Sequence, residues 1–135
     1  PHRQYINEKG WVSHDLEEIY ANVLVVCREV AEKAGIDPAQ IAAMGISNQR
    51  ETVAAWDRAD GTPVGQAIVW QCARAKGICD TLASHAEAVR EKTGLPLSPY
   101  FSASKMAWIL QNHPEAAALA AKERLALGTV ILSAA

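Results

Sequence analysis

The strongest pattern along the chain is an amphipathic stretch that begins near residue 15. Apolar residues recur there at three- and four-residue spacing, as they do on one face of an α-helix: Ile19, Val23, Val26, Cys27, Val30 and Ala34. Asp15 followed by Glu18 has the form of a capping box, and Gly35 is suited to the end of a helix. The pattern therefore predicts a helix over residues 15–35.

Shorter apolar segments predict strands. The run over residues 41–46 lacks polar alternation, which is typical of a strand buried on both faces. Residues 52–57 and 64–70 are two further strand segments, and the Asp-Gly pair at 60–61 predicts a hairpin turn between them. The last apolar run, residues 125–132, predicts a final strand.

Helical spacing returns in the second half of the chain. It extends from residue 72 to Gly94, and either Ser102 or Ser104 can cap a further helix. An alanine-rich helix is expected from Pro114 onward. No internal repeat or low-complexity linker interrupts this alternation of helices and strands, so the sequence predicts one α/β domain or a part of one.

Composition narrows the classes of function. The chain has 135 residues, of which 50% are hydrophobic, enough for one globular core. Thirteen Lys and Arg residues are scattered among fifteen Asp and Glu residues, for a net charge of −2, so the basic face of a nucleic-acid-binding protein is not expected. No apolar run approaches the ~18 residues of a membrane span.

The cysteines and histidines indicate neither a metal site nor a redox site. Cys27, Cys72 and Cys79 form no CxxC pair and have no histidine at metal-ligand spacing. We interpret them as free thiols, as expected in a reducing, cytoplasmic compartment. The chain also lacks the glycine-rich loops that cradle phosphates in P-loop and dinucleotide-binding proteins.

A polar cluster, residues 47–51, follows the predicted strand at 41–46 directly. Ligands of open α/β sheets bind outside the carboxyl ends of the strands. Within the cluster Arg50 donates hydrogen bonds and Glu51 accepts them, so together they can recognise hydroxyl groups. An Arg–Glu pair on the protein surface is the simpler alternative, and spacing alone favours it.

Two aromatic segments are further candidates. Trp70-Gln71 ends a predicted strand, where an aromatic face can cover the carbon skeleton of a small polar ligand. Packing of Trp70 against the following helix is the simpler alternative, and it is the favoured one when Trp70 is considered alone. Tyr100 precedes a predicted helix, so its hydroxyl either reaches a ligand or anchors the loop. None of these segments decides the function by itself.

Taken in order, these segments resemble the FGGY family of carbohydrate kinases over about residues 8–130, nearly the whole chain. The segments that carry the resemblance are 10–15, 44–52, 56–58, 67–71, 93–95, 99–102, Lys105, 108–110 and 128–130. The Asn-Gln-Arg-Glu-Thr and Pro-Tyr-Phe-Ser sequences within them are similar to the branch that phosphorylates glycerol, rather than to the xylulose or ribulose branches.

The resemblance implies a ribonuclease H-like domain of the actin-like ATPase superfamily, an α/β fold with a mixed sheet and flanking helices. Two such domains close over substrate and ATP. If these residues have the roles of their counterparts in the family, Arg50 and Glu51 would hold the hydroxyls of a polyol, and Tyr100 would hydrogen-bond to it. Trp70 would line the carbon side of the polyol, and Gln71 would lie at the rim of the same pocket.

The resemblance further implies that residues 1–135 are an incomplete N-terminal kinase domain. This piece would hold the substrate-binding portion, without the phosphate-binding strands and without the C-terminal domain. The general-base Asp is expected outside it, so no catalytic residue is assigned within it. ATP and Mg²⁺ are expected as cofactors of the parent protein, and the piece alone is expected to turn over negligibly. Family members often form dimers or tetramers, so a homo-oligomer is also expected.

Three departures from the family pattern leave the acceptor open. Ala73 and Ala75 stand where the family usually has Arg and Thr, and Ser98 stands where it usually has Asp. These changes favour one alternative, a kinase of another sugar or sugar alcohol. A polyol-binding relative without catalysis is an alternative of a different class, and a chain whose pocket is not formed is a third.

Overall fold

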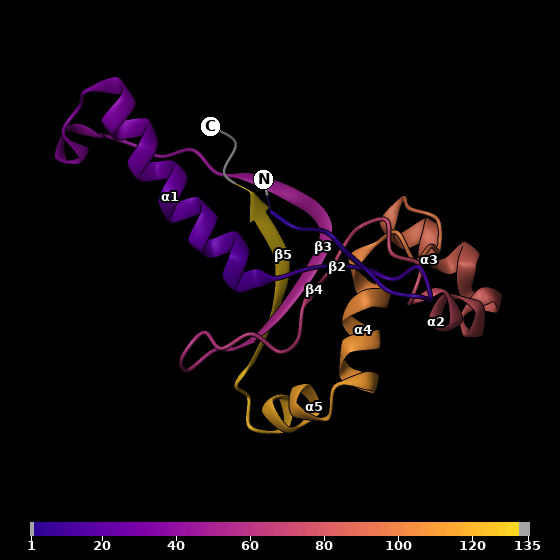
Figure 1. The fold of residues 1–135 in the computed structure, drawn as a ribbon. Coiled ribbons are helices and arrows are strands. Elements are labelled where there is room, and N and C mark those ends of the chain that lie inside the picture. The colour runs from indigo at the N-terminus through magenta and orange to yellow at the C-terminus, as the bar shows by residue number, and fades with distance from the viewer. Residues whose placement is uncertain (1, 133–135) are drawn as a thin grey trace.

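The computed structural model describes residues 2–132, arranged as one sheet with helices on both faces (Figure 1). Five strands follow the order β1-β2-β4-β3-β5. Every described strand pairing is antiparallel, where a mixed sheet was expected. The strands are β1 (Tyr5–Ile6), β2 (Val12–His14), β3 (Ser47–Asp57), β4 (Ala67–Ile68) and β5 (Leu125–Leu132).

The helices lie on opposite faces of this sheet because β3 alternates its side chains. Val53 and Ala55 are buried with residues of the later helices, whereas Ala54 is buried with Ile19 on the other face. The later helices are α2 (Lys76–Thr81), α3 (Ala86–Thr93), α4 (Ser102–Asn112) and α5 (Pro114–Ala121), and α1 (Leu16–Ala34) covers the first face. Two short 3₁₀ turns, Pro38–Gln40 and Ala83–His85, complete the order.

The predicted first helix is confirmed at both ends. The Asp15 carboxylate accepts hydrogen bonds from the backbone N–H groups of Glu17 and Glu18, and Gly35 ends the helix with a φ of 64°. The capping box is only half formed, because the Glu18 carboxylate accepts a hydrogen bond from the Arg3 backbone N–H (2.7 Å). Glu18 thus ties the first turn of α1 to the segment before β1.

The apolar face of α1 is buried only in part. Ile19 and Ala31 are the buried residues of the helix, while Val26, Cys27 and Val30 are exposed. Figure 1 shows why: the first turns of α1 cross the sheet and the last turns extend beyond it. The periodicity therefore predicted the helix correctly but overestimated how much of it is covered.

The predicted strand at residues 41–46 is wrong. This segment forms no strand, all six residues are exposed, and the Met44 side chain is 71% exposed. Strand β3 begins at Ser47 instead. An apolar run without alternation needs a strand beside it and cover on both faces. Within residues 2–132 no strand pairs with this segment, so neither condition is met.

The hairpin prediction is confirmed, with one strand shorter than expected. The backbone turns over between Asp57 and Thr62, where Gly61 takes a φ of 80°. Trp56 then bridges Pro63 in antiparallel fashion. The second strand is limited to Ala67–Ile68, so residue 70 lies outside the ladder.

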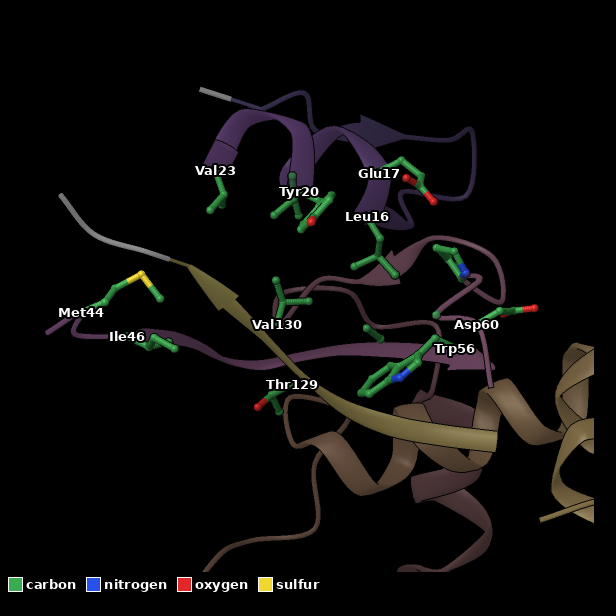
Figure 2. A pocket seen from close by; sticks show the side chains of 14 residues that line it. Leu16, Glu17, Tyr20, Val23, Met44, Ile46, Trp56, Asp60, Thr129 and Val130 are labelled. Atoms are coloured by element: carbon green, nitrogen blue, oxygen red, sulfur yellow. The ribbon is translucent and has the colours of Figure 1, made fainter. Parts of the chain in front are cut away.

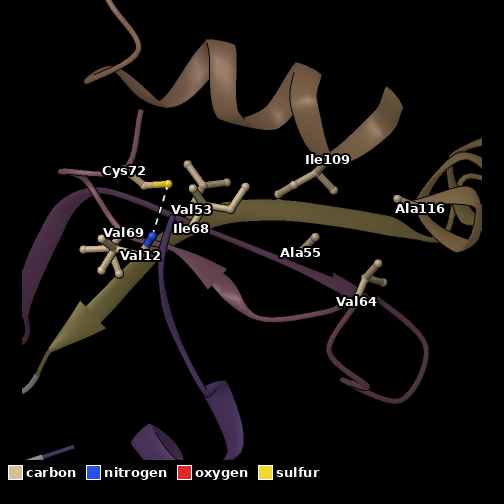
Figure 3. Packing of buried hydrophobic residues seen from close by; sticks show 9 residues of the cluster. All are labelled: Val12, Val53, Ala55, Val64, Ile68, Val69, Cys72, Ile109 and Ala116. Atoms are coloured by element: carbon tan, nitrogen blue, oxygen red, sulfur yellow. Dashed lines mark hydrogen bonds between the residues drawn. The ribbon is translucent and has the colours of Figure 1, made fainter. Parts of the chain in front are cut away.

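The main core lies between the sheet and the helices α4 and α5 (Figure 3). Ile109 of α4 and Ala116 of α5 pack onto Val53 and Ala55 of β3. The Cys72 thiol is buried in the same cluster and accepts a hydrogen bond from a backbone N–H of β2 at 3.4 Å. Cys72 and Cys79 are free and buried, whereas Cys27 is free and exposed. No helix in the described range is long and apolar enough to cross a membrane.

Candidate functional site

Arg50 and Glu51 lie on a bulge in the longest strand of the sheet. On β5, Val130 and Thr129 are consecutive, but their partners on β3 are Gln49 and Val53. Three residues of β3, numbers 50–52, therefore have no counterpart on β5 and bulge out of the ladder. A bulge of this kind redirects side chains out of the regular alternation, and here it presents Arg50 and Glu51 at one end of the sheet.

The backbone at the bulge is strained. Glu51 has a φ of 65°, in the left-handed region that residues other than glycine seldom occupy. Such a conformation costs about 1–3 kcal/mol and persists only where surrounding contacts enforce it. Strained residues of this kind are concentrated at functional sites.

The enforcing contact comes from the start of α4. The Glu51 Oε2 atom accepts hydrogen bonds from the backbone N–H of Ser102 (2.7 Å) and from its hydroxyl (2.6 Å). Because the first N–H groups of a helix lack partners within the helix and carry partial positive charge, a carboxylate is stabilised there. The other carboxylate oxygen, Oε1, accepts no hydrogen bond from the described part of the chain.

An aromatic pair lies beside the bulge. The Trp70 and Tyr100 rings are 5.9 Å apart between centroids, inclined at 64°, and the two residues are 42% and 43% exposed. The buried Thr52 hydroxyl accepts hydrogen bonds from the Trp70 backbone N–H (3.2 Å) and from the Gln49 side chain (2.9 Å). Thr52 thus fixes the segment of Trp70 to the segment of Arg50.

The Tyr100 backbone is held on both sides. Its N–H donates to the Ser98 hydroxyl (3.2 Å), and its carbonyl accepts from the Lys105 ammonium. The Asp that the family usually has at position 98 is replaced by a residue that still accepts a hydrogen bond at this position. The change at 98 therefore leaves the Tyr100 loop anchored.

These elements enclose an open depression of about 240 Å³, lined by Asn48, Gln49, Arg50, Trp70 and Tyr100. Three of the five predicted site residues, Arg50, Trp70 and Tyr100, therefore line the same space. Glu51 adjoins it on the bulge, with Oε2 turned to α4. Gln71 is exposed on the turn after Trp70 and is not among the lining residues.

The contacts observed at this site differ from those that the simpler alternatives predicted. Arg50 and Glu51 form no ion pair within residues 2–132, so they are not the surface pair that spacing favoured. Trp70 packs edge-to-face against Tyr100 rather than into a helix core, and nearly half of it faces solvent. Polar groups and an exposed aromatic face converge on one small space, an arrangement that suits a hydroxylated ligand.

Sequence reasoning missed four contributors to this site. Asn48 and Gln49 belonged to the polar cluster but were not singled out, and Lys105 was noted only as part of the resemblance. Ser102 or Ser104 was expected to cap α4, yet the N-cap position is Phe101, and the Ser102 side chain binds Glu51. A lysine within the apolar stripe of a predicted helix was the one signal that could have drawn attention to position 105.

The single Arg retained after Trp70 has a structural role. The Arg74 guanidinium lies between the rings of Trp11 and Trp108, 5.1 and 5.2 Å from their centroids, and donates to the Ser13 hydroxyl (2.7 Å). Burial raises the pKa of the Cys72 thiol, but hydrogen bonds from Arg74 outweigh it and the pKa lies below its usual value. Arg74 thus holds the first strands against α4 and does not line the depression.

A second, larger hollow of about 730 Å³ lies between α1 and the strands β3 and β5 (Figure 2). Its walls are mostly apolar, formed by α1, the exposed segment around Met44 and Ile46, and Trp56 and Val130 of the sheet. Its polar side chains are few (Glu17, Tyr20, Asp60 and Thr129), so a polyol placed there would find fewer hydrogen-bond partners than in water. Its size therefore does not make it the site for a hydroxylated ligand.

The α/β fold described above, one sheet with helices on both faces, is the fold that this chain shares with sugar kinases. The chain belongs to the FGGY family of carbohydrate kinases, whose N-terminal domain model matches residues 1–131. A crystal structure of Plasmodium falciparum glycerol kinase with ADP superposes with a TM-score of 0.86 at 34% identity, over 94% of this chain and 26% of that one. The predicted α/β, ribonuclease H-like fold class is thereby confirmed.

Curated relatives identify the particular branch that the chain resembles. The glycerol kinase of Sinorhizobium fredii (strain NBRC 101917 / NGR234) is 51% identical over 130 residues, which are 95% of this chain and 26% of that protein. Glycerol kinase 1 of Thermotoga maritima is 46% identical over 131 residues, 96% of this chain and 27% of that protein. The chain thus spans about a quarter of the length of the curated relatives it matches.

Proposed function

We propose that the full-length protein containing this chain transfers a phosphoryl group from ATP to a primary hydroxyl of glycerol or a related small polyol. The similarity to glycerol kinases supports the reaction and the acceptor. The observation that carries the proposal is the β3 bulge, which sets Arg50 and Glu51 beside the Trp70–Tyr100 pair. Residues 1–135 would form the substrate-binding portion of the N-terminal domain.

The acceptor would be bound by complementary hydrogen bonds. The Arg50 guanidinium donates to hydroxyl oxygens, and the free Oε1 of Glu51 accepts from hydroxyl hydrogens. The Tyr100 hydroxyl adds a third polar contact, and the exposed face of Trp70 covers the carbon chain. Gln71, on the adjoining turn, shapes the rim. Because hydroxyl recognition needs both donors and acceptors, this set fits a polyol better than a carboxylate or a phosphate.

ATP and its Mg²⁺ ion would be held by other parts of the full-length protein. The Plasmodium falciparum glycerol kinase structure is described with ADP. Among residues 2–132, no group of three or more His, Cys, Asp or Glu side chains is placed to hold a metal ion, and we assign none. MgATP would supply the phosphoryl group and the charge compensation that phosphoryl transfer requires. The general base would likewise come from outside this chain.

This chain would contribute orientation and exclusion of water. Closure of a second domain over the depression would bury the acceptor, limiting hydrolysis of ATP by water. A cytoplasmic location is proposed with it, supported by the three free cysteines. Assembly into a homo-oligomer stays a prediction.

The test is ADP release by the full-length protein with MgATP and a panel of acceptors: glycerol, erythritol, xylitol, ribitol and several ketoses. The 135-residue chain alone serves as a control and is expected to match a protein-free sample. Strong release with glycerol supports the proposal. Release only with a ketose would replace the acceptor and keep the family, and no release with any acceptor would overturn the kinase assignment in favour of a polyol-binding relative.

A further inference from the structure

The Lys105 side chain is wholly enclosed. Its exposed fraction is 0%, and it is the largest of the fully buried side chains. Moving an ammonium group out of water costs hydration free energy, and a neutral side chain of similar shape would cost far less. Burial accordingly lowers the pKa of Lys105, an effect opposed by the Glu51 carboxylate and the thiols of Cys72 and Cys79. A lysine in this position therefore requires contacts that compensate for its burial.

The first compensating contact is to Tyr100, one of the residues predicted to bind the substrate. Side chains on a helix lean toward its N-terminus. The Lys105 side chain accordingly reaches back past the start of α4, where its ammonium donates to the Tyr100 backbone carbonyl. The same ammonium lies 5.9 Å from the centroid of the Tyr100 ring. Together with Ser98, which accepts from the Tyr100 N–H, it fixes the loop from both sides.

The charge of Glu51 also favours the buried ammonium, without a direct contact among the described residues. Lys105 and Ser102 are three residues apart, so they share a side of α4. Ser102 binds the Glu51 carboxylate directly, and Lys105 acts on it through charge without forming an ion pair within the described residues. The first turns of α4 thus hold two site residues at once: Tyr100 through its backbone carbonyl and Glu51 through its carboxylate.

We propose that Lys105 is a positioning residue for the acceptor pocket, where its buried ammonium fixes the Tyr100 loop and balances the charge of Glu51. The inference rests on the proposed kinase function. A merely structural lysine would support α4 and the whole fold alike. A positioning lysine affects the acceptor without affecting ATP, because neither of its two partners is expected to touch the nucleotide.

The experiment compares Lys105→Met and Lys105→Gln with the wild type in the full-length protein, measuring kcat and the two KM values separately. Lys105→Met removes both the donor and the charge, whereas Lys105→Gln keeps a donor. Loss of a charged hydrogen bond and of a balancing charge is expected to raise KM for glycerol about tenfold or more in Lys105→Met. Lys105→Gln should fall between Lys105→Met and the wild type. KM for MgATP should change by less than about twofold in both variants.

A double-mutant cycle with Tyr100→Phe adds a second readout. If Lys105 acts through Tyr100, the two effects on KM for glycerol combine to less than their product. Should Lys105→Met fail to fold, as judged by near-ultraviolet circular dichroism, the comparison and the cycle are made with Lys105→Gln.

Three results would overturn the inference. Equal rises in both KM values would indicate a structural role, and effects that multiply in the cycle would separate Lys105 from Tyr100. An unchanged KM for glycerol in a folded, active variant would contradict it outright. These results leave the kinase proposal standing, whereas a wild-type protein without acceptor-dependent ADP release overturns the proposed function itself.

Discussion

At the scale of single residues, Glu51 has two roles in one side chain. The strain of its left-handed backbone is offset by the two hydrogen bonds that Ser102 donates to Oε2. Since both bonds use one oxygen, the second oxygen stays available for a ligand. The same contact therefore stabilises the bulge and supplies a partner to the first N–H of α4.

Ser102→Ala tests this arrangement, because it removes the hydroxyl donor and keeps the backbone N–H. A hydrogen bond to a charged group contributes about 1.5–3 kcal/mol, so KM for glycerol should rise by about tenfold to a hundredfold in the full-length protein. Ser102→Thr, which keeps the hydroxyl, is the matched control and should stay near the wild-type value. Steady-state kinetics checks the prediction; a Ser102→Ala protein with wild-type KM would show that Glu51 needs no such support.

The residue scale also shows what sequence could and could not provide. Arg50 and Glu51 were identifiable because several polar side chains follow an apolar run, and Trp70 and Tyr100 because they are aromatic residues next to predicted elements. The contact between Glu51 and Ser102 joins residues 51 positions apart, and no local pattern encodes it. The position of Gln71 as a rim residue stays a prediction.

At the scale of elements, the pairing of β3 with β5 is fastened at one end by an ion pair. The Arg124 guanidinium donates to both carboxylate oxygens of Asp57, with Nε at 3.0 Å from Oδ1. The backbone N–H of Ala59 donates to the same carboxylate at 2.9 Å. These hydrogen bonds, that of Ala59 first, hold the pKa of Asp57 below its ordinary value.

A carboxyl group whose pKa is lower in the folded than in the unfolded state stabilises the fold only while it is ionised. Its contribution is complete above the unfolded pKa, about 4, and is lost as the pH falls through the folded value. Asp57→Asn should therefore lower the thermal midpoint by a few degrees at pH 7, and the difference from the wild type should shrink steadily below about pH 4.

Thermal unfolding followed by circular dichroism across this pH range checks the prediction. Asp80→Asn is the matched control, because Asp80 forms an exposed i,i+4 pair with Lys76 that is expected to contribute little. A difference between Asp57→Asn and the wild type that stays constant with pH would show that the ion pair does not account for the stability.

Elements were predictable where their pattern is satisfied locally. The first helix has its capping residue, its terminal glycine and its periodicity within one segment, and all three appear in the structure. The hairpin likewise depends on a local turn. The segment at 41–46 shows the limit: an apolar run indicates that burial is favourable, but a strand forms only where another strand supplies hydrogen bonds.

At the scale of the whole molecule, the two faces of the sheet differ in how completely they are covered. The face toward α4 and α5 has a continuous core around Val53 and Ile109 (Figure 3). The face toward α1 has a smaller buried cluster around Ile19 and leaves the hollow of about 730 Å³ beside it (Figure 2). The candidate site draws on the well-packed face, because Ser102 and Lys105 of α4 hold Glu51 and Tyr100.

This difference explains why the candidate site is organised although apolar surface remains on the other face. Two residues that line the depression are held through their backbones by contacts from the packed half: Trp70 by Thr52 and Tyr100 by Lys105. Sequence periodicity indicates which residues favour burial, but not which element covers them. The resemblance supplied the family, and the structure supplied the contacts that hold the site.

The most direct test compares the wild-type full-length protein with Arg50→Ala in glycerol-dependent ADP release, with Arg58→Ala as the control. Arg58 is an exposed arginine at the far end of β3. Loss of the Arg50 donor should lower kcat/KM for glycerol about a hundredfold, equivalent to about 2.7 kcal/mol, with KM for MgATP nearly unchanged. Arg58→Ala should match the wild type. Full glycerol-dependent activity in Arg50→Ala would contradict the account, because the bulge of β3 would then not bind the acceptor.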